Sequence, residues 1–113
     1  MKSKIFLSII MLILLALFSY SSGQNTGSEN IVLEGGRMGK VSFPHHIHQN
    51  ILGECNYCHN LFPKASNSIK KLKAEGKLKK KEIMNYCRDC HQTKAINKEK
   101  AGPTSCKACH QNN

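Results

Sequence analysis

Three short segments of the chain place two cysteines and a histidine at one repeated spacing. Each has the form Cys-x-x-Cys-His, and together they use all six cysteines of the 113 residues. Two thiols separated by two residues can each add to one vinyl group of the same porphyrin, and the adjacent imidazole can then bind the iron. The sequence therefore predicts three covalently bound haem c groups. Their residues are Cys55, Cys58 and His59; Cys87, Cys90 and His91; and Cys106, Cys109 and His110.

Other uses of paired cysteines fit this spacing less well. Structural zinc sites share one ion between two Cys-x-x-Cys pairs and place the histidine away from the pair. Redox-active pairs lie at a strand–helix junction of a larger fold, and this chain has no room for three of them. A disulfide framework has no reason to place a histidine after every second cysteine. A zinc protein is the weaker alternative that we keep.

The composition after residue 23 is too polar for an ordinary hydrophobic core. Leu, Ile, Val and Phe account for 15 of these 90 residues, and 15 basic residues face 7 acidic ones, a formal +8. Such a chain cannot bury enough apolar surface to offset its ordering entropy. Three porphyrins would supply the missing surface, so we expect an apoprotein that is largely unfolded and folds with haem attachment.

The beginning of the chain has the pattern of a secretory signal peptide. A basic start precedes an apolar run from Ile5 to Tyr20, and small residues follow the run. Because the run is slightly short for a membrane span of about 20 residues, an uncleaved anchor is the less favoured alternative. Cleavage near Gly23–Gln24 would release the chain into the periplasm. The predicted divisions are a cleaved signal peptide at 1–23, a flexible tail at 24–30 and one domain at 31–113.

Short elements should position the first motif. Ile31–Glu34 and Lys40–Phe43 have the pattern of strands separated by glycines, which predicts a β-hairpin. Pro44 and Gly53 are typical of the two ends of a helix, here His45 to Leu52. We therefore predict a small, mainly α, haem-cored domain with an N-terminal two-stranded hairpin and little regular secondary structure.

The segment between the first and second motifs is rich in lysine. A helix from Ile69 to about Met84, capped by Ser68, should be continuous or broken at Gly76. Beyond the second motif, residues 92–104 have the composition of a polar linker. The second motif follows this helix, and the third follows the linker.

A haem used only for electron transfer generally has both axial positions filled by protein. Beyond the motif histidines, the chain has three more, at positions 45, 46 and 48. Three residues within four positions cannot easily reach three separate irons, whereas two can reach two porphyrins. The residues alone therefore leave the sixth ligand of one iron open.

The order of these features resembles a known family. A short hairpin, then Phe-Pro-His-x-x-His at 43–48, then Cys-x-x-Cys-His is similar to the opening of the triheme cytochrome c7 proteins, smaller relatives of the cytochrome c3 family. Gly-Pro-Thr at 102–104 is similar as well, and the resemblance covers most of 31–110. It implies that His45 pairs with His59 on the first haem.

The resemblance also implies the ligands of the second haem, His48 and His91. His46 matches a position that is not a ligand in the family, and we interpret it as an exposed spare histidine. The family's third distal ligand is usually a histidine just before the middle motif, where this chain has Met84 instead. Related domains use methionine there, so we predict Met84 opposite His110 on the third haem. Packing of Met84 against a porphyrin is the alternative.

The resemblance implies an electron carrier rather than an enzyme, with a role in anaerobic respiration between an inner-membrane donor and a terminal reductase or metal ion. The alternative is a small haem reductase or gas-binding protein, which needs one open iron site. Seven lysines between 70 and 81 indicate a solvated face or a docking surface for acidic or membrane-bound redox partners. We expect a monomer, and no nucleic-acid recognition module is present in the sequence.

Overall fold

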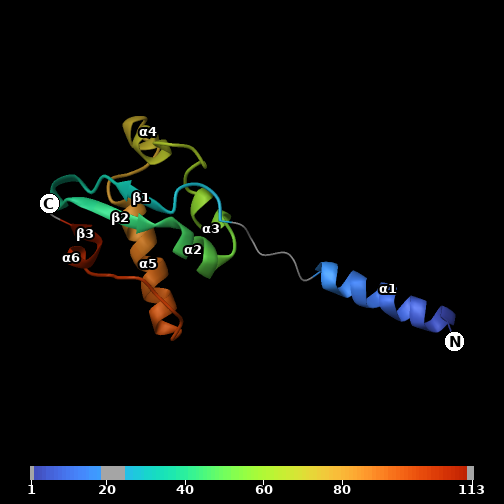
Figure 1. Cartoon of the computed structure of the whole chain (residues 1–113). Coiled ribbons are helices and arrows are strands. Elements are labelled where there is room, and N and C mark those ends of the chain that lie inside the picture. The colour runs from blue at the N-terminus through green and yellow to red at the C-terminus, as the bar shows by residue number, and fades with distance from the viewer. Residues whose placement is uncertain (1, 19–24, 112–113) are drawn as a thin grey trace.

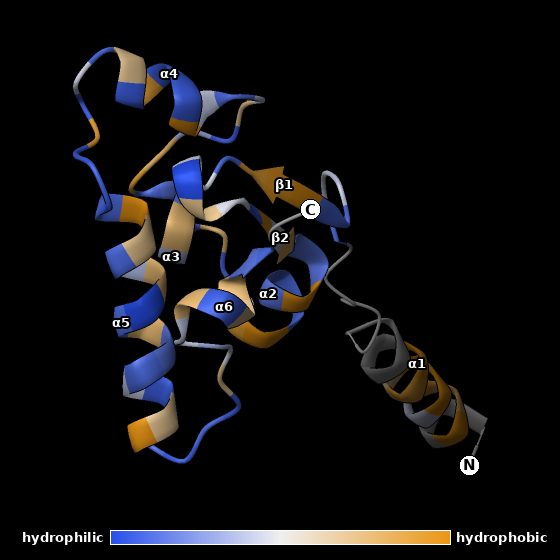
Figure 2. Cartoon of the chain, turned by 90° about the vertical axis from the view of Figure 1, so that its left-hand side faces the viewer, coloured by the Kyte–Doolittle hydropathy of each residue, from blue (hydrophilic) through white to orange (hydrophobic). Residues whose placement is uncertain are grey.

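The computed structural model describes residues 2–18 and 25–111. Helix α1 spans Lys2–Phe18 and contains most of the predicted apolar run. Its side chains between Ile5 and Ile13 are exposed, and the orange of this helix in Figure 2 marks most of these residues as hydrophobic. Within the described ranges, no helix combines the length and the hydropathy that crossing a membrane requires. The predicted cleavage site near Gly23–Gln24 lies outside the described residues.

The predicted hairpin forms and gains a third strand. Strands β1 (Asn30–Leu33) and β2 (Lys40–Pro44) are antiparallel and are connected through a short 3-10 turn, η1 (Gly36–Met38). Strand β3 (His110–Gln111) pairs with the other edge of β2. Because β3 begins at the last histidine of the third motif, the sheet holds that motif beside the hairpin. Figure 1 shows α2 and α3 near one end of the sheet and α6 near the other.

The first helix of the domain has the predicted bounds. Helix α2 spans His45–Leu52 and ends at Gly53, whose φ of +72° is left-handed and whose N–H donates to the carbonyl of Gln49. The first and third motifs form one-turn helices, α3 (Asn56–His59) and α6 (Cys106–Cys109). His59 is therefore the last residue of α3, and His110 directly follows α6.

The lysine-rich segment corrects two predictions. Helix α4 spans Ser68–Ala74, so Ser68 is its first residue and not its cap; the cap position is Asn67, which makes no side-chain capping bond. The helix breaks before Gly76, whose φ is +71°. A second helix, α5, then spans Glu82–Ile96 and contains the whole second motif. The predicted linker at 92–104 thus begins only after Ile96, because its first residues continue the helix.

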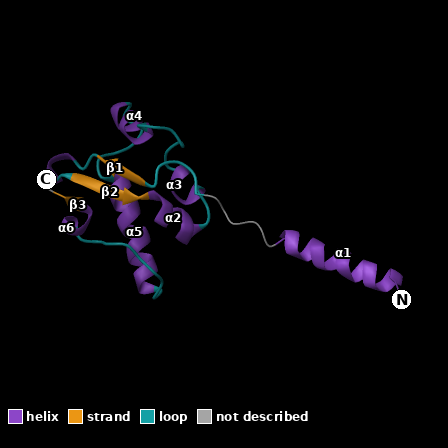
Figure 3. Cartoon of the chain, viewed as in Figure 1, coloured by secondary structure: helices purple, strands orange, loops and turns teal. Residues whose placement is uncertain are grey.

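The domain has almost no core made of side chains. Among the described residues, Leu78 is the one buried hydrophobic side chain, at 6% exposure. Larger apolar groups such as Val32, Tyr57 and Ile96 are exposed by 55% or more. Figure 3 shows short helices and strands connected by long loops. Packing of this kind needs apolar surface beyond that of the side chains, as the composition predicts.

Candidate functional site

Four of the six histidines form two facing pairs. The imidazole of His45 in α2 and that of His59 in α3 have centroids 6.3 Å apart. The imidazoles of His48 in α2 and His91 in α5 are 6.1 Å apart. A metal atom bonded to one nitrogen of each ring, at about 2 Å per bond, would fit midway between two such rings. Each pair is therefore spaced to hold one iron between two imidazoles.

Five histidines use the same ring nitrogen to bond to the backbone. The Nδ1 atom of each lies within 3.1 Å of a carbonyl oxygen, and because a carbonyl only accepts, Nδ1 must carry the proton. Nε2 then keeps a free lone pair, which is the state of a metal-binding imidazole. The donors and their acceptors are His45 and Ser28, His48 and Pro44, His59 and Phe62, His91 and Pro103, and His110 and Gly39.

His46 differs from the other five in its hydrogen bond. Its Nε2 atom, rather than Nδ1, donates to the carbonyl of Gly27 over 3.0 Å. Its side chain is half-buried and not exposed as predicted, because the segment before β1 lies against α2. The nitrogen that the other histidines leave free is thus occupied in His46.

Small and aromatic residues enclose two of the paired rings. A Cβ atom at Gly102 would lie 2.5 Å from Cε1 of His91, so only a residue without a side chain fits against this ring. The ring of Phe43 lies 4.3 Å from that of His48, measured between centroids. These contacts fix the orientation of both imidazoles from outside their own helices.

The third motif histidine lies in different surroundings. Among the described residues, no second imidazole faces His110. A Cβ atom at Gly35 would come within 2.5 Å of its Nδ1, so the hairpin turn packs directly on this ring. Met84 is half-buried in α5, three residues before Cys87. Its role as the ligand opposite His110 stays a prediction.

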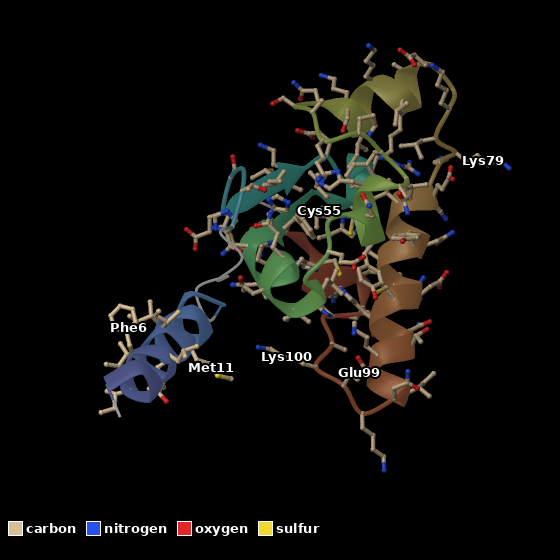
Figure 4. The ribbon with its side chains drawn as sticks, turned by 90° about the vertical axis from the view of Figure 1, so that its right-hand side faces the viewer. Phe6, Met11, Cys55, Lys79, Glu99 and Lys100 are labelled. Atoms are coloured by element: carbon tan, nitrogen blue, oxygen red, sulfur yellow. The ribbon has the colours of Figure 1, made fainter. Side chains whose placement is uncertain are left out.

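Cysteines from all three motifs lie near Cys87. All six are within the described residues, and no two of them form a disulfide. Burial, followed by the neighbouring thiols of Cys58, Cys90 and Cys109, raises the pKa of Cys87 to about 11. Since these thiols come from all three motifs, the predicted haem sites converge on one region. Figure 4 shows Cys55 near the middle of the domain in that view.

A tyrosine links the first two motifs, which the sequence analysis did not predict. Tyr86 directly precedes Cys87, and its hydroxyl donates to the backbone carbonyl of Tyr57 in α3. Burial raises the pKa of Tyr86, with smaller contributions from nearby thiols, so the hydroxyl keeps its proton at neutral pH. This bond fixes α5 to α3. The signal in the sequence is a tyrosine directly before a cysteine at each of these two motifs, Tyr57 before Cys58 and Tyr86 before Cys87.

The zinc alternative would need ligands from two cysteine pairs around one ion. Over the parts of the chain that the structure describes, no group of three or more His, Cys, Asp or Glu side chains is arranged to hold a metal ion in this way. The histidines instead approach one another in twos. That arrangement fits axial ligation of separate haem irons.

Seven exposed lysines lie in α4 and in the loop before α5. Glu75 pairs with Lys71 over 4.0 Å and with Lys77 over 2.9 Å. The other lysines of the cluster form no ion pair with any described residue, and Figure 4 shows Lys79 pointing outward at the edge of the molecule. The members of this lysine cluster are Lys70, Lys71, Lys73, Lys77, Lys79, Lys80 and Lys81.

Comparison with known proteins agrees with this site. The family model described as "Cytochrome c7 and related cytochrome c" matches residues 41–111. A cytochrome c7 of Geobacter metallireducens is 31% identical over 97 residues, which cover 86% of this chain and 91% of that protein. The solution structure of triheme cytochrome PpcA from Geobacter sulfurreducens is 28% identical, with a TM-score of 0.53, over 75% of this chain and 100% of that one.

A further solved structure has the same architecture. PpcE, a cytochrome c7 from Geobacter sulfurreducens, is 30% identical, with a TM-score of 0.50, over 74% of this chain and 97% of that one. The resemblance seen in the sequence is confirmed, as are the fold class and the three haem c groups. The chain belongs to the cytochrome c7 family, whose members are triheme c-type cytochromes that transfer electrons.

Proposed function

We propose that this chain is a periplasmic electron carrier in which each of the three irons has two protein ligands. The observation that supports this proposal is the two pairs of facing imidazoles, each with one member on α2: His45 with His59 at 6.3 Å and His48 with His91 at 6.1 Å. All four rings keep Nε2 free because Nδ1 donates to the backbone. Filled axial positions leave no iron site for a substrate.

The haems would be held by thioether bonds from the six cysteines and by the three motif histidines. Bound in this way, each haem supplies a one-electron redox centre. The distal ligands are His45 for the first haem, His48 for the second and Met84 for the third. Met84 lies one helical turn before Cys87 in α5, and a thioether is a suitable ligand for haem iron.

We further propose that the lysine cluster docks acidic redox partners. Its exposed side chains and few ion pairs leave a positive field in front of α4 and the following loop. Such a field increases encounter rates with negatively charged surfaces, and the resulting complexes can stay weak. The donor would be a membrane-bound protein and the acceptor a terminal reductase or a metal ion. A purely solvated face is the alternative.

Two features support the proposal that the chain is exported. They are the sequence of the first 23 residues and helix α1, whose apolar side chains from Ile5 to Ile13 are exposed. A free helix of this kind is suited to a signal peptidase substrate. Covalent haem attachment in bacteria requires maturation outside the cytoplasm, which fits a periplasmic carrier.

One experiment tests this proposal. The full chain is produced in a host with c-type maturation machinery, and the protein is purified from the periplasmic fraction. We expect an intact mass equal to the chain from about residue 24 plus three haems, and a reduced spectrum that carbon monoxide does not change. A chain retained in the membrane, or one without haem, would contradict the proposal.

A second function has one observation in its favour, the absence among described residues of an imidazole facing His110. If Met84 does not bind, the third haem has an open site and could reduce or bind a small molecule. Carbon monoxide binding to one haem in three would support this alternative, because the two bis-histidine haems have no open position.

A further inference from the structure

Four residues before β1 lie along the first turns of α2, and we name them the N-terminal strap (26–29). Backbone carbonyls of the strap accept three hydrogen bonds from α2. Glu29 accepts from the N–H of His46 over 3.2 Å, Ser28 from Nδ1 of His45 over 3.1 Å, and Gly27 from Nε2 of His46 over 3.0 Å. The strap thus runs along the first turn of α2, which carries the two proposed distal iron ligands, His45 and His48.

A glutamine fastens the other end of the strap. The amide of Gln49 accepts from the N–H of Thr26 over 3.2 Å and donates to its carbonyl over 2.9 Å. The sequence predicts a flexible tail over 24–30, and in the structure residues 26–29 of it are bonded to α2 through three side chains, those of His45, His46 and Gln49. His46 bonds to the carbonyl of Gly27, and the next carbonyl along the chain, that of Ser28, accepts from His45.

The strap also completes the start of α2. The first N–H groups of any helix have no partner inside it. In α2 the cap position is Pro44, and no side-chain hydrogen bond caps these groups. The carbonyl of Glu29 takes up the N–H of His46. Gly27 has a φ of +74°, and a Cβ atom there would be 3.5 Å from Cε1 of His45. The backbone therefore turns closely over the edge of the His45 imidazole.

We propose that His46 is a positioning residue for the first haem. Its Nε2–H holds Gly27, and so keeps the next carbonyl, that of Ser28, on Nδ1–H of His45. A carbonyl acceptor on Nδ1 makes an imidazole more basic and a stronger donor to iron, which favours the oxidised state and lowers the reduction potential. The inference rests on the proposed function, because it requires His45 to be an iron ligand.

The test uses the haem-loaded full chain with His46→Ala, and the midpoint potential of each haem is resolved by an NMR-monitored redox titration. We expect the first haem to shift upward relative to the other two, while all haems stay low-spin and six-coordinate. His46→Gln, whose amide can still donate to Gly27, should restore most of the shift. Gln49→Ala should shift the same haem in the same direction, and Asn50→Ala, exposed on the same helix, should not.

Three outcomes would overturn the inference. The first is an unchanged first-haem potential in His46→Ala, and the second is an equal shift of all three haems, which would indicate a global effect on stability. The third is a high-spin haem in His46→Ala, which would make His46 an iron ligand. A separate variant, His45→Ala, tests the premise: a first haem that stays six-coordinate there would refute the ligand assignment under the proposed function instead.

Discussion

The imidazoles of His45 and His59 stand nearly at right angles, with an interplanar angle of 83° and centroids 6.3 Å apart. Helix α2 brings His45 to α3, and the same helix brings His48 to His91 in α5. One two-turn helix thus serves two of the three haem sites. Substitutions on α2 should therefore change one haem at a time.

The first prediction concerns His48→Met. A thioether in place of imidazole raises the potential of a haem, so the second haem should shift upward, on the order of 0.1 V. The first and third haems should change little, because His48 faces only His91 among the proposed ligands. Haem-resolved redox titration measures the shift. If the potential of the first haem shifted instead of that of the second, His48 would be the ligand of the first haem and His45 that of the second.

The second prediction concerns Met84→His. If Met84 binds the third iron, a second imidazole should lower the potential of that haem, again on the order of 0.1 V. Met38→Leu is the matched control, since Met38 lies 49% exposed in η1. If the third-haem potential were unchanged in Met84→His, Met84 would not be an iron ligand and would only pack against the haem.

The third prediction concerns Gly102→Ala. The added Cβ would lie 2.5 Å from His91, so the ring or the loop has to move. We expect a loss of about 1–3 kcal/mol in the free energy of unfolding and an altered second-haem potential. Thermal unfolding and redox titration check both effects. Ala101→Ser, at the exposed neighbouring position, should behave like the wild type. If Gly102→Ala changed neither the stability nor the second-haem potential, the close contact between Gly102 and His91 would be contradicted.

The fourth prediction concerns the lysine cluster. The variant Lys79→Gln, Lys80→Gln should slow electron exchange with an acidic redox protein about tenfold at low ionic strength, and added salt should remove the difference. Lys98→Gln, Lys100→Gln removes the same charge outside the cluster and is the control. Stopped-flow kinetics over a range of salt concentrations measure the rates. Equal slowing in both variants would point to net charge and not to a docking surface.

The fifth prediction concerns pH. Lys94 lies 2.7 Å from Glu99, and this contact lowers the pKa of Glu99 and raises that of Lys94. Because the pKa of Glu99 is lowered on folding, its stabilising contribution is present above the ordinary carboxyl pKa and is lost as the pH falls through the lowered value. Lys94→Gln should raise the pKa of Glu99 in an NMR titration.

The effect of Lys94→Gln on stability should be small, since Glu99 is exposed and Lys94 is only half-buried. Its thermal unfolding should differ from the wild type at neutral pH and coincide with it in acid, once Glu99 is protonated in both proteins. A difference that persists in acid would assign the effect to packing of the lysine stem and not to the ion pair.

Local patterns predicted α2 and the hairpin well, because Pro44, Gly53 and the glycines of the turn act within a few residues of where they stand. The length of α5 and the strand β3 were missed for different reasons. The second motif is compatible with helix on its own, and only packing decides whether the helix continues. Strand β3 has two residues, too few for an alternating pattern, and exists through its pairing with β2.

The sequence by itself determined the chemistry: three covalent haem sites, a polar chain that needs them as a core, and three further histidines on one short segment as candidate distal ligands. Those conclusions depend on residue type and spacing, which the printed chain contains. The family resemblance implied which imidazoles pair, and the structure places those pairs face to face. Only the tertiary structure decided which ring nitrogen each one leaves free. That choice is made by backbone carbonyls such as those of Ser28 and Pro103, and a carbonyl is the same in every residue, so no pattern of side chains reveals where it will lie.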